Sequence, residues 1–468
     1  MTAMALEQVR EMIQKAPLTR RLGTVRKLHG MVIESAGPQT RIGELCAVIP
    51  PEENVPRKLA HLIDTPVSGL LAEEAVPVLA EVVGIHADHV TLMPYGAISG
   101  LATGSHVIAL GTLSSIGVGK ALLGRVIDGF GRALDGQAAP QTTVVQALKS
   151  KSINPMQRPP INQILETGVR SIDALLTLGQ GQRVGIFAGS GVGKSTLLGM
   201  IARHVTADVN VIALIGERGR EVKDFIERQL GSEGLQRSVV VVATADQPAL
   251  ARIRAVYAAL AIAEYFRDQG RQVLLTMDSI TRFGMARREV GLAAGEPPTA
   301  RGYTPSVFAE LPELCERCGT APSGGAITAL LTVLVEGDDF NEPVSDALRA
   351  ILDGHIVLSR HLAHQGQYPA IDLLKSASRL LSELSNASER VVMQEAIRVL
   401  SLLERSRQMV DLGAYESGSN PELDAALACQ PRLQQWLRQS AGGVRRPQAL
   451  QELEQALSKP LKVEGGLA

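Results

Sequence analysis

The spacing of apolar residues changes several times along the 468-residue chain, and each change predicts a different kind of element. Over residues 1–20, apolar side chains recur at one-face helical spacing until Pro17, which predicts an amphipathic N-terminal arm. Short β-rich runs separated by turn residues follow at 30–34, 46–49, 80–83 and 89–92. Short strands at this spacing predict a small β-barrel domain over residues 21–96.

A different pattern occupies residues 97–380. After a turn-rich connection at 122–136, short and nearly all-apolar runs alternate with amphipathic helical stretches. These runs lie at 184–187, 209–215, 238–242, 273–275 and 329–335, and they are typical of parallel strands buried on both faces. We therefore predict a doubly wound α/β core with a parallel sheet. Helical spacing beyond residue 380 predicts a C-terminal helical domain over 381–468.

Composition and charge narrow the functional classes. The net charge is −1 and the aromatic residues are only 7 Phe, 6 Tyr and 1 Trp, which argues against nucleic acid as a partner. No run approaches the roughly 18 consecutive apolar residues of a membrane helix. Glu7 and Glu11 interrupt the apolar core that a signal peptide needs. We expect a cytoplasmic protein with at most peripheral membrane contact.

The four cysteines are widely scattered, which is no disulfide framework. Cys315 and Cys318 form a CxxC pair, but neither a second pair nor suitably spaced histidines follow. We expect both thiols to be buried one helical turn apart and to hold no metal.

A phosphate-binding loop stands out at 188–195, where the strand 184–187 runs through AGSGVGKS into a helical pattern. Glycines allow the backbone N–H groups to surround phosphate oxygens at a helix N-terminus. Lys194 is expected to contact the β- and γ-phosphates, and the Ser195 hydroxyl to bind Mg²⁺. The nucleotide-binding residues predicted from this loop are Gly189, Ser190, Gly191, Val192, Gly193, Lys194, Ser195 and Thr196. The similar tetrapeptide at 117–120 lacks a hydroxyl after its lysine, and we interpret it as an ordinary loop.

Two acidic residues follow other core strands. Asp278 ends the run 273–277 and is placed to hold Mg²⁺, although a helix N-cap is an alternative role. Glu217 follows 209–215, at the edge where open α/β sheets bind ligands, and could polarise an attacking water. From the residues alone, this role competes evenly with a surface salt-bridge cluster, to which we assign Arg220 and Glu221.

The motifs together resemble the ATPase family that contains rotary ATP synthase catalytic subunits and type III secretion ATPases. The resemblance runs from about residue 20 to beyond 430 and rests on AGSGVGKS, GERGRE, LLTMDS, PPTARGYTPSVF, LPELCER, ILDGHIVLSR and YPAIDLLKSASR. It implies a RecA-like P-loop NTPase core between an N-terminal β-barrel and a C-terminal helical domain. It also implies a hexameric ring with Mg²⁺–ATP at subunit interfaces.

The resemblance further assigns roles to single residues. Glu217 would be the catalytic carboxylate, and Arg218 would help to order the site. Tyr368 would stack on adenine, and Arg379 would reach into the site of the neighbouring subunit. Because one chain carries both the P-loop and the arginine, identical copies could complete each other's sites.

Within this family the segments FAGSGVGKS, VKDFIE and TVLVEGDD are most similar to the flagellar export ATPase. An injectisome ATPase of virulence secretion, a subunit of a rotary ion pump and an RNA translocase are the alternatives, in that order. An export ATPase implies a regulatory or stator protein at the N-terminal arm, a stalk protein in the ring centre, an export gate and chaperone–substrate complexes. It also implies a location at the inner face of the cytoplasmic membrane. From the residues alone, the arm 1–20 could equally be free of any contact.

Overall fold

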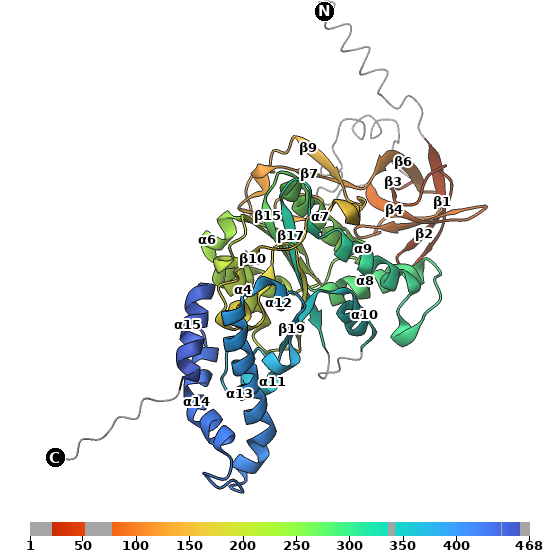
Figure 1. The fold of residues 1–468 in the computed structure, drawn as a ribbon. Helices are drawn as coiled ribbons and strands as arrows, with labels where there is room; N and C mark the ends of the chain where they lie inside the picture. Colours follow the sequence, from red (N-terminus) through yellow and green to blue (C-terminus); the bar gives the residue numbers. More distant parts are fainter. Residues whose placement is uncertain (1–20, 52–76, 336–341, 441, 459–468) are drawn as a thin grey trace, which may run out of the picture.

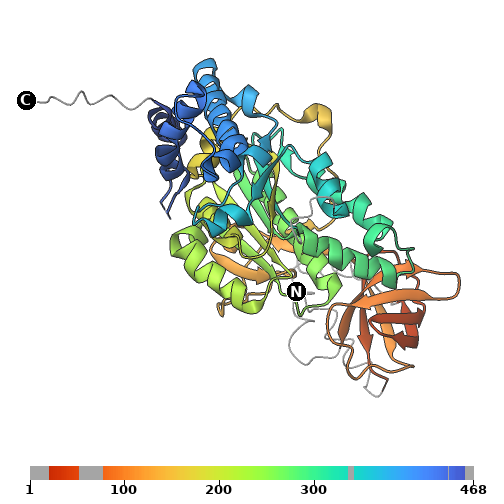
Figure 2. The same cartoon turned by 90° about the horizontal axis from the view of Figure 1, so that it is seen from below.

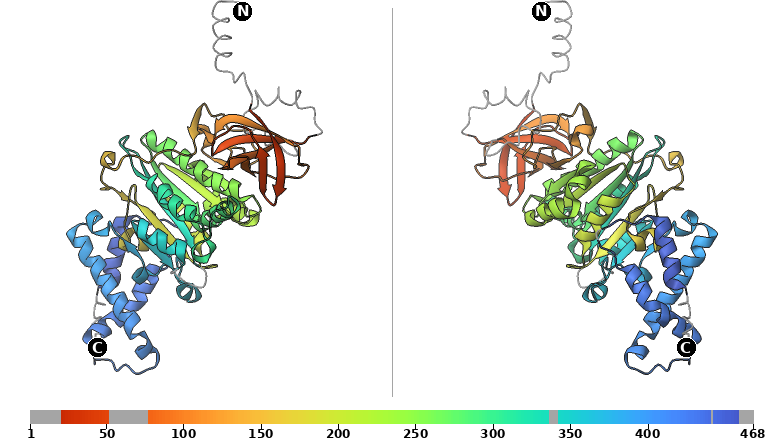
Figure 3. Two further views of the ribbon diagram at one scale, coloured as in Figure 1. Left: turned by 90° about the vertical axis from the view of Figure 1, so that its right-hand side faces the viewer. Right: turned by 90° about the vertical axis from the view of Figure 1, so that its left-hand side faces the viewer.

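The computed structural model describes residues 21–51, 77–335, 342–440 and 442–458. Three units follow one another in space in the order of the sequence (Figure 1). A β-barrel lies at one end, an α/β core in the middle and a group of helices at the other end (Figure 3). The predicted N-terminal arm falls outside the described residues.

Six antiparallel strands close the barrel in the order β1-β2-β5-β4-β3-β6. They are β1 (Leu22–His29), β2 (Val32–Ala36), β3 (Glu44–Ile49), β4 (Val78–Ile85), β5 (Val90–Pro94) and β6 (His106–Leu113). The last strand pairs with both β1 and β3, so the barrel extends beyond residue 96, where the sequence pattern placed its end. The turns at 96–104 lead back into the same sheet.

The core sheet has the strand order β19-β18-β12-β17-β15-β13-β14-β8. Its strands are β8 (Arg125–Asp128), β12 (Arg183–Ala188), β13 (Val209–Ile215), β14 (Ser238–Ala243), β15 (Gln272–Asp278), β17 (Ala326–Leu334), β18 (Gly354–Leu358) and β19 (Ala377–Ser378). All neighbours on this path run parallel except β18 and β19. Two parallel strands, β8 and β18, were not predicted, and β8 lies within the stretch interpreted as turns.

Short pairs of strands flank the core sheet. They are β7 (Ser115–Val118) with β9 (Val144–Ala147), β10 (Ile164–Leu165) with β11 (Leu178–Gly179), and β16 (Gly319–Thr320) against β17. Gly117 and Val118, which belong to the P-loop-like tetrapeptide 117–120, lie in β7 and not in a phosphate-binding turn.

Helices cover both faces of the core sheet (Figure 2). One face carries α3 (Arg170–Leu175), α4 (Lys194–His204), α5 (Gly219–Asp224), the π-helical turn η3 (Phe225–Leu230) and α6 (Gly231–Gln236), and the other carries α7 (Ala249–Asp268), α8 (Ile280–Ala293), α9 (Pro305–Glu316) and α10 (Pro343–Ile351). Along β13, Val211 and Ala213 pack toward α7, whereas Ile212 and Leu214 pack toward α4. This two-sided burial explains why the core strands are continuous apolar runs.

The C-terminal unit consists of α12 (Leu381–Leu384), α13 (Ala387–Asp411), α14 (Pro421–Leu437) and α15 (Arg446–Leu457), and α11 (Arg360–His364) lies between it and the core. Asn386 and Glu389 form a capping box at the start of α13. Arg446 pairs with Glu389 and donates to the carbonyl of Asp173 in α3, which joins α13 and α15 to the core. The predicted fold class is therefore confirmed.

Cys315 and Cys318 are both free and buried, as predicted. Burial raises the pKa of both thiols, that of Cys318 to about 12, so both stay neutral at ordinary pH. Among the described residues, no helix combines the length and the apolar content that a membrane span requires.

Candidate nucleotide-binding site

The glycine-rich loop lies between the end of β12 at Ala188 and the start of α4 at Lys194. Gly191 and Gly193 adopt positive φ angles of 76° and 87°, which glycine reaches without strain. Val192 is buried and anchors the loop, whereas Ser190, Ser195 and Thr196 are exposed. The loop and the first turn of α4 thus form a backbone cradle for an anion.

Lys194 brings together two carboxylates from separate strands. Its Nζ atom lies 2.5 Å from Oδ1 of Asp278 and 3.6 Å from Oε1 of Glu217. Asp278 ends β15 opposite Leu214 of β13, and Glu217 follows β13 after one further turn residue. All three side chains are less than one fifth exposed, so their charges interact more strongly than they would in water.

Asp278 is held by a residue that the sequence analysis missed. The Thr332 hydroxyl donates to Oδ1 of Asp278 at 2.7 Å from the adjacent strand β17. The sequence feature that could have identified Thr332 is its hydroxyl, which stands in the otherwise apolar run 329–335. Ser279, and not Asp278, caps α8 by accepting a hydrogen bond from the Arg282 backbone. The alternative role of Asp278 as an N-cap is therefore not observed.

The environment of Glu217 favours its neutral form. Burial raises the pKa of Glu217 to about 7; Lys194 lowers it, whereas Asp278 and a hydrogen bond with Glu221 raise it further. A carboxyl group with this pKa can exchange a proton near neutral pH. The turn before it requires Gly216, because φ is 71° and an added Cβ would lie 3.0 Å from Arg282.

Arg218 lies at the rim of the site. Its side chain is 78% exposed and its guanidinium is 3.6 Å from Oε1 of Glu221. Glu221, which the sequence analysis assigned to a surface cluster, contacts Arg218 on one side and influences Glu217 on the other. Glu221 is thus nearer to the reacting groups than its sequence position suggested.

Tyr368 lies beside the loop. A Cβ added at Gly193 would be 3.3 Å from Cδ1 and Cε1 of the Tyr368 ring. The ring is about half exposed and lines a cavity of about 520 Å³ whose other wall is the end of α14 and the residues after it. An aromatic face beside a phosphate-binding loop suits a nucleobase.

Arg379 lies away from this chain's own loop. Ser378 pairs with Gly354, and Gly354 pairs with Val184 near the start of β12. The loop begins after Ala188, four residues further along β12, which corresponds to about 13 Å of strand. The exposed guanidinium contacts only the carbonyl of Arg349 among the hydrogen bonds described for its side chain.

The residues present fit a magnesium–nucleotide. The cradle offers N–H groups and one ammonium to phosphates, and the Asp278 carboxylate is an oxygen ligand of the kind Mg²⁺ prefers. The Lys194 ammonium lies between the carboxyl groups of Asp278 and Glu217, and a nucleotide phosphate would likewise place negative charge beside it.

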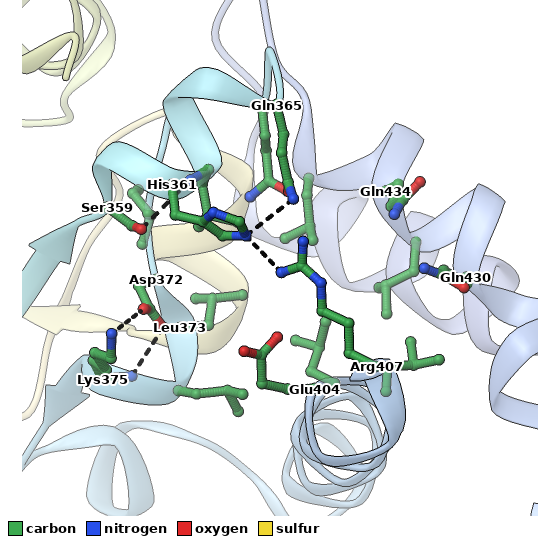
Figure 4. Close-up of a pocket in the computed structure, with 18 of the residues that line it drawn as sticks. Ser359, His361, Gln365, Asp372, Leu373, Lys375, Glu404, Arg407, Gln430 and Gln434 are labelled. Carbon is green, nitrogen blue, oxygen red and sulfur yellow. Dashed lines mark hydrogen bonds and ion pairs between the residues drawn. The ribbon is translucent and has the colours of Figure 1, made fainter. Parts of the chain in front are cut away.

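A second cavity of about 710 Å³ lies between the core and the helical unit. Figure 4 shows Arg407 of α13 pointing toward His361 of α11, and the Arg407 guanidinium lies 2.5 Å from Nε2 of His361. Gln365 also approaches this nitrogen, at 3.0 Å. None of the predicted site residues lines this cavity.

A P-loop ATPase is the class that this fold and this site define. Three family models match the chain: the ATP synthase alpha/beta family β-barrel domain at 27–111, its nucleotide-binding domain at 168–378, and the C-terminal domain of the type III secretion ATPase EscN at 386–457. The chain belongs to the ATP synthase alpha/beta family, in its flagellar and type III secretion branch.

Individual relatives agree with this assignment. The flagellum-specific ATP synthase of Bacillus subtilis is 49% identical, over 97% of this chain and 98% of the relative. In Salmonella typhimurium, the flagellum-specific ATP synthase is 47% identical over 93% of each chain, and the SPI-2 type 3 secretion system ATPase is 44% identical over 94% of this chain and 95% of the relative.

Solved structures agree as well. The assembled ATPase EscN of enteropathogenic E. coli superimposes with a TM-score of 0.84 at 41% identity, covering 93% of this chain and all of that one. EscN in complex with its central stalk EscO gives a TM-score of 0.82 at 40% identity with the same coverage. The chain is thus an ATP-hydrolysing enzyme of the flagellar and type III secretion class, as the sequence predicted.

Proposed function

We propose that this ATPase hydrolyses Mg²⁺–ATP to energise protein export by a flagellar export apparatus. The observation that carries the hydrolytic part is the convergence of Lys194, Asp278 and Glu217 beside the glycine-rich loop. Flagellum-specific relatives support the flagellar part, because the flagellar protein of Salmonella is more similar to this chain than the SPI-2 ATPase of the same organism.

Each residue of the site has a separate role in the proposed reaction. Lys194 and the loop N–H groups bind and orient the phosphates, and Tyr368 supports the adenine. Asp278 and the Ser195 hydroxyl would hold Mg²⁺, which when bound neutralises phosphate charge. Glu217 orients the attacking water and accepts its hydrogen bond. Arg218, paired with Glu221, keeps the rim of the site in order.

The site is completed by a second copy of the chain. Arg379 lies at the opposite end of β12 from its own loop, which supports a role in the neighbouring subunit's site. Because each copy supplies a loop on one side and an arginine on the other, copies would associate head to tail, and the ring that we propose is a homohexamer. The assembled state of EscN supports this arrangement.

The same proposal extends to partners. The complex of EscN with its central stalk supports a stalk protein in the centre of this ring. We further propose a regulatory or stator protein at residues 1–20, and an export gate with chaperone–substrate complexes as the clients. Such partners place the ring at the inner face of the cytoplasmic membrane.

ATP turnover across a protein-concentration series tests the hydrolytic part. We expect specific activity to rise steeply with concentration as rings assemble, without any requirement for RNA. Full specific activity in dilute monomer would contradict sites shared between subunits, and turnover that depends on homopolymer RNA would indicate a translocase on RNA instead.

Virulence secretion is the second candidate, supported by the match of residues 386–457 to the EscN C-terminal domain model. Complementation separates the two systems. The gene for this chain should restore motility to a strain that lacks its flagellar ATPase, and a Lys194→Ala variant should not. Restoration of injectisome secretion without motility would favour the second candidate.

A further inference from the structure

Gln439 links Tyr368, the proposed contact for adenine, to the C-terminal helices. It follows the last turn of α14 and is 8% exposed. Its backbone N–H donates to the carbonyl of Tyr368 at 2.9 Å, so the segment that carries the aromatic ring is tethered directly to the end of α14.

The Gln439 side chain uses both of its amide hydrogens within the protein. Nε2 donates to the carbonyls of Gly168 and Gly442, each at 2.7 Å. Oε1 accepts the backbone N–H of Arg170 at 2.8 Å. A single carboxamide therefore connects the residues before α3, the start of α3 and the link between α14 and α15. It has no free donor with which to recognise a base.

The same junction contacts the far end of the P-loop helix. Gly168 and Gly443 both pack against His204, the last residue of α4, and an added Cβ would lie 2.4 Å and 2.6 Å from its atoms. Val444 donates its backbone N–H to the carbonyl of Gly168 at 3.0 Å. The helix that begins at the phosphate cradle thus ends at the junction that holds Tyr368.

We propose that Gln439 is a positioning residue for nucleotide binding, which fixes Tyr368 relative to α4 through the Gly168–Arg170 segment. The proposal rests on the proposed function in one respect, the contact of Tyr368 with adenine. The hydrogen bonds described for Gln439 go to Gly168, Arg170, Gly442 and Tyr368. None goes to Lys194, Glu217 or Asp278, so its loss should weaken binding while these three side chains stay in place. Through the buried carboxamide of Gln439, the position of Tyr368 depends on how α14 and α15 pack.

The near-isosteric variant Gln439→Glu tests this role. A carboxylate keeps the acceptor for Arg170 but faces the carbonyls of Gly168 and Gly442 without donors. We expect the Kd for N-methylanthraniloyl-ADP and the KM for ATP to rise about tenfold, with kcat changed less than about threefold. Binding is followed by energy transfer from Trp436, the single tryptophan of the chain.

Acid rescue distinguishes positioning from general damage. Protonation of the new carboxyl restores one donor, so the Kd of Gln439→Glu should fall toward the wild-type value as the pH is lowered from 8 to 6. Gln439→Met, which has no donor, should bind weakly at both pH values. Gln451→Glu, the same change on the exposed face of α15, is the matched control and should bind as wild type.

The outcomes separate the inference from the proposed function. An unchanged Kd in folded Gln439→Glu and Gln439→Met overturns the inference, as does a fall in kcat with Kd unchanged. If wild type binds the probe but hydrolyses no ATP, the proposed function fails while the positioning role is still decided by the Kd values. Absence of probe binding by wild type overturns both.

Discussion

At the scale of single residues, the site contains three ionisable side chains that lie close together and are mostly shielded from water. Lys194 lies between Asp278 and Glu217, and the two carboxylates differ in their support. Asp278 receives the Thr332 hydroxyl, whereas Glu217 lies near two other carboxyl groups. Because of this difference in surroundings, Asp278 is suited to bind a cation and Glu217 to exchange a proton.

The raised pKa of Glu217 predicts a pH profile. In the proposed mechanism the carboxylate form of Glu217 is the active one, so kcat/KM for ATP should fall about tenfold per pH unit below a pKa of about 7. Glu217→Gln should bind ATP but hydrolyse it about 10²–10⁴-fold more slowly, with this acid limb gone. An acid limb that persists in the variant would assign the titration to another group.

The same shift predicts a change in stability. A folded-state pKa above the unfolded value of 4.5 means that the folded protein holds the proton more tightly, so Glu217 lowers the free energy of unfolding as pH rises through 4.5 to 7. Nucleotide-free Glu217→Gln should therefore melt at a higher temperature than wild type at pH 8. Near pH 4 the two melting temperatures should converge.

At the scale of elements, strand ends and helix starts create the site. The carboxyl ends of β12, β13 and β15 lie at one edge of the sheet, and α4 begins there. The sequence predicted these elements because each core strand is apolar on both faces. It missed β8 and β18, which are short and lie next to turn residues or charged ones.

Gly193 lies in the glycine-rich loop beside the Tyr368 ring. Its replacement can separate an effect on nucleotide affinity from an effect on stability. Gly193→Ala places a methyl group at positive φ and against the Tyr368 ring, so we expect nucleotide binding to weaken about tenfold or more. Gly324→Ala is the control, because Gly324 has a φ of 82° but open space around it. Both variants should lose about 1–2 kcal/mol of stability, and only the first should lose affinity. Equal affinities, measured by calorimetry, would remove the Tyr368 contact from the account.

At the scale of the whole molecule, the glycine-rich loop and Arg379 lie apart, and we propose that they serve different sites. The loop with Lys194 lies at one end of β12 and Arg379 beside the other. The exposed Arg379 guanidinium donates a hydrogen bond to the carbonyl of Arg349, and we propose that it reaches a neighbouring subunit.

Mixed rings test this arrangement directly. Arg379→Ala should retain nucleotide binding and lose turnover about 10³-fold or more, and Lys194→Ala should lose binding. Mixing the two inactive variants should restore part of the activity, because some interfaces then combine an intact loop with an intact arginine. The control mixture of Lys194→Ala with Glu217→Gln should stay inactive, since both changes lie on the same side of the interface. No recovery in the first mixture would place Arg379 outside the neighbour's site.

Whether a feature could be predicted from the sequence depends on how far apart in the chain its interacting residues lie. The P-loop was recognisable because its glycines, lysine and serine are contiguous and sit between a strand and a helix. Thr332 and Gln439 were missed because their partners lie on other elements, up to 271 residues away for Gln439 and Gly168. Glu221 was underrated although Arg218 and Glu217 are close in sequence, because the sequence does not show how deeply Glu217 is buried. A lone hydroxyl or amide carries no periodic signal along the chain.

The sequence by itself determined the order of barrel, core and helices, the phosphate-binding loop and the family, because these depend on local periodicity and contiguous motifs. Tertiary structure decided which strand closes the barrel, how the surroundings of Asp278 and Glu217 differ, and which residues contact Tyr368. These features depend on burial and on contacts between distant segments, where the cost of an unpaired polar group selects the partner.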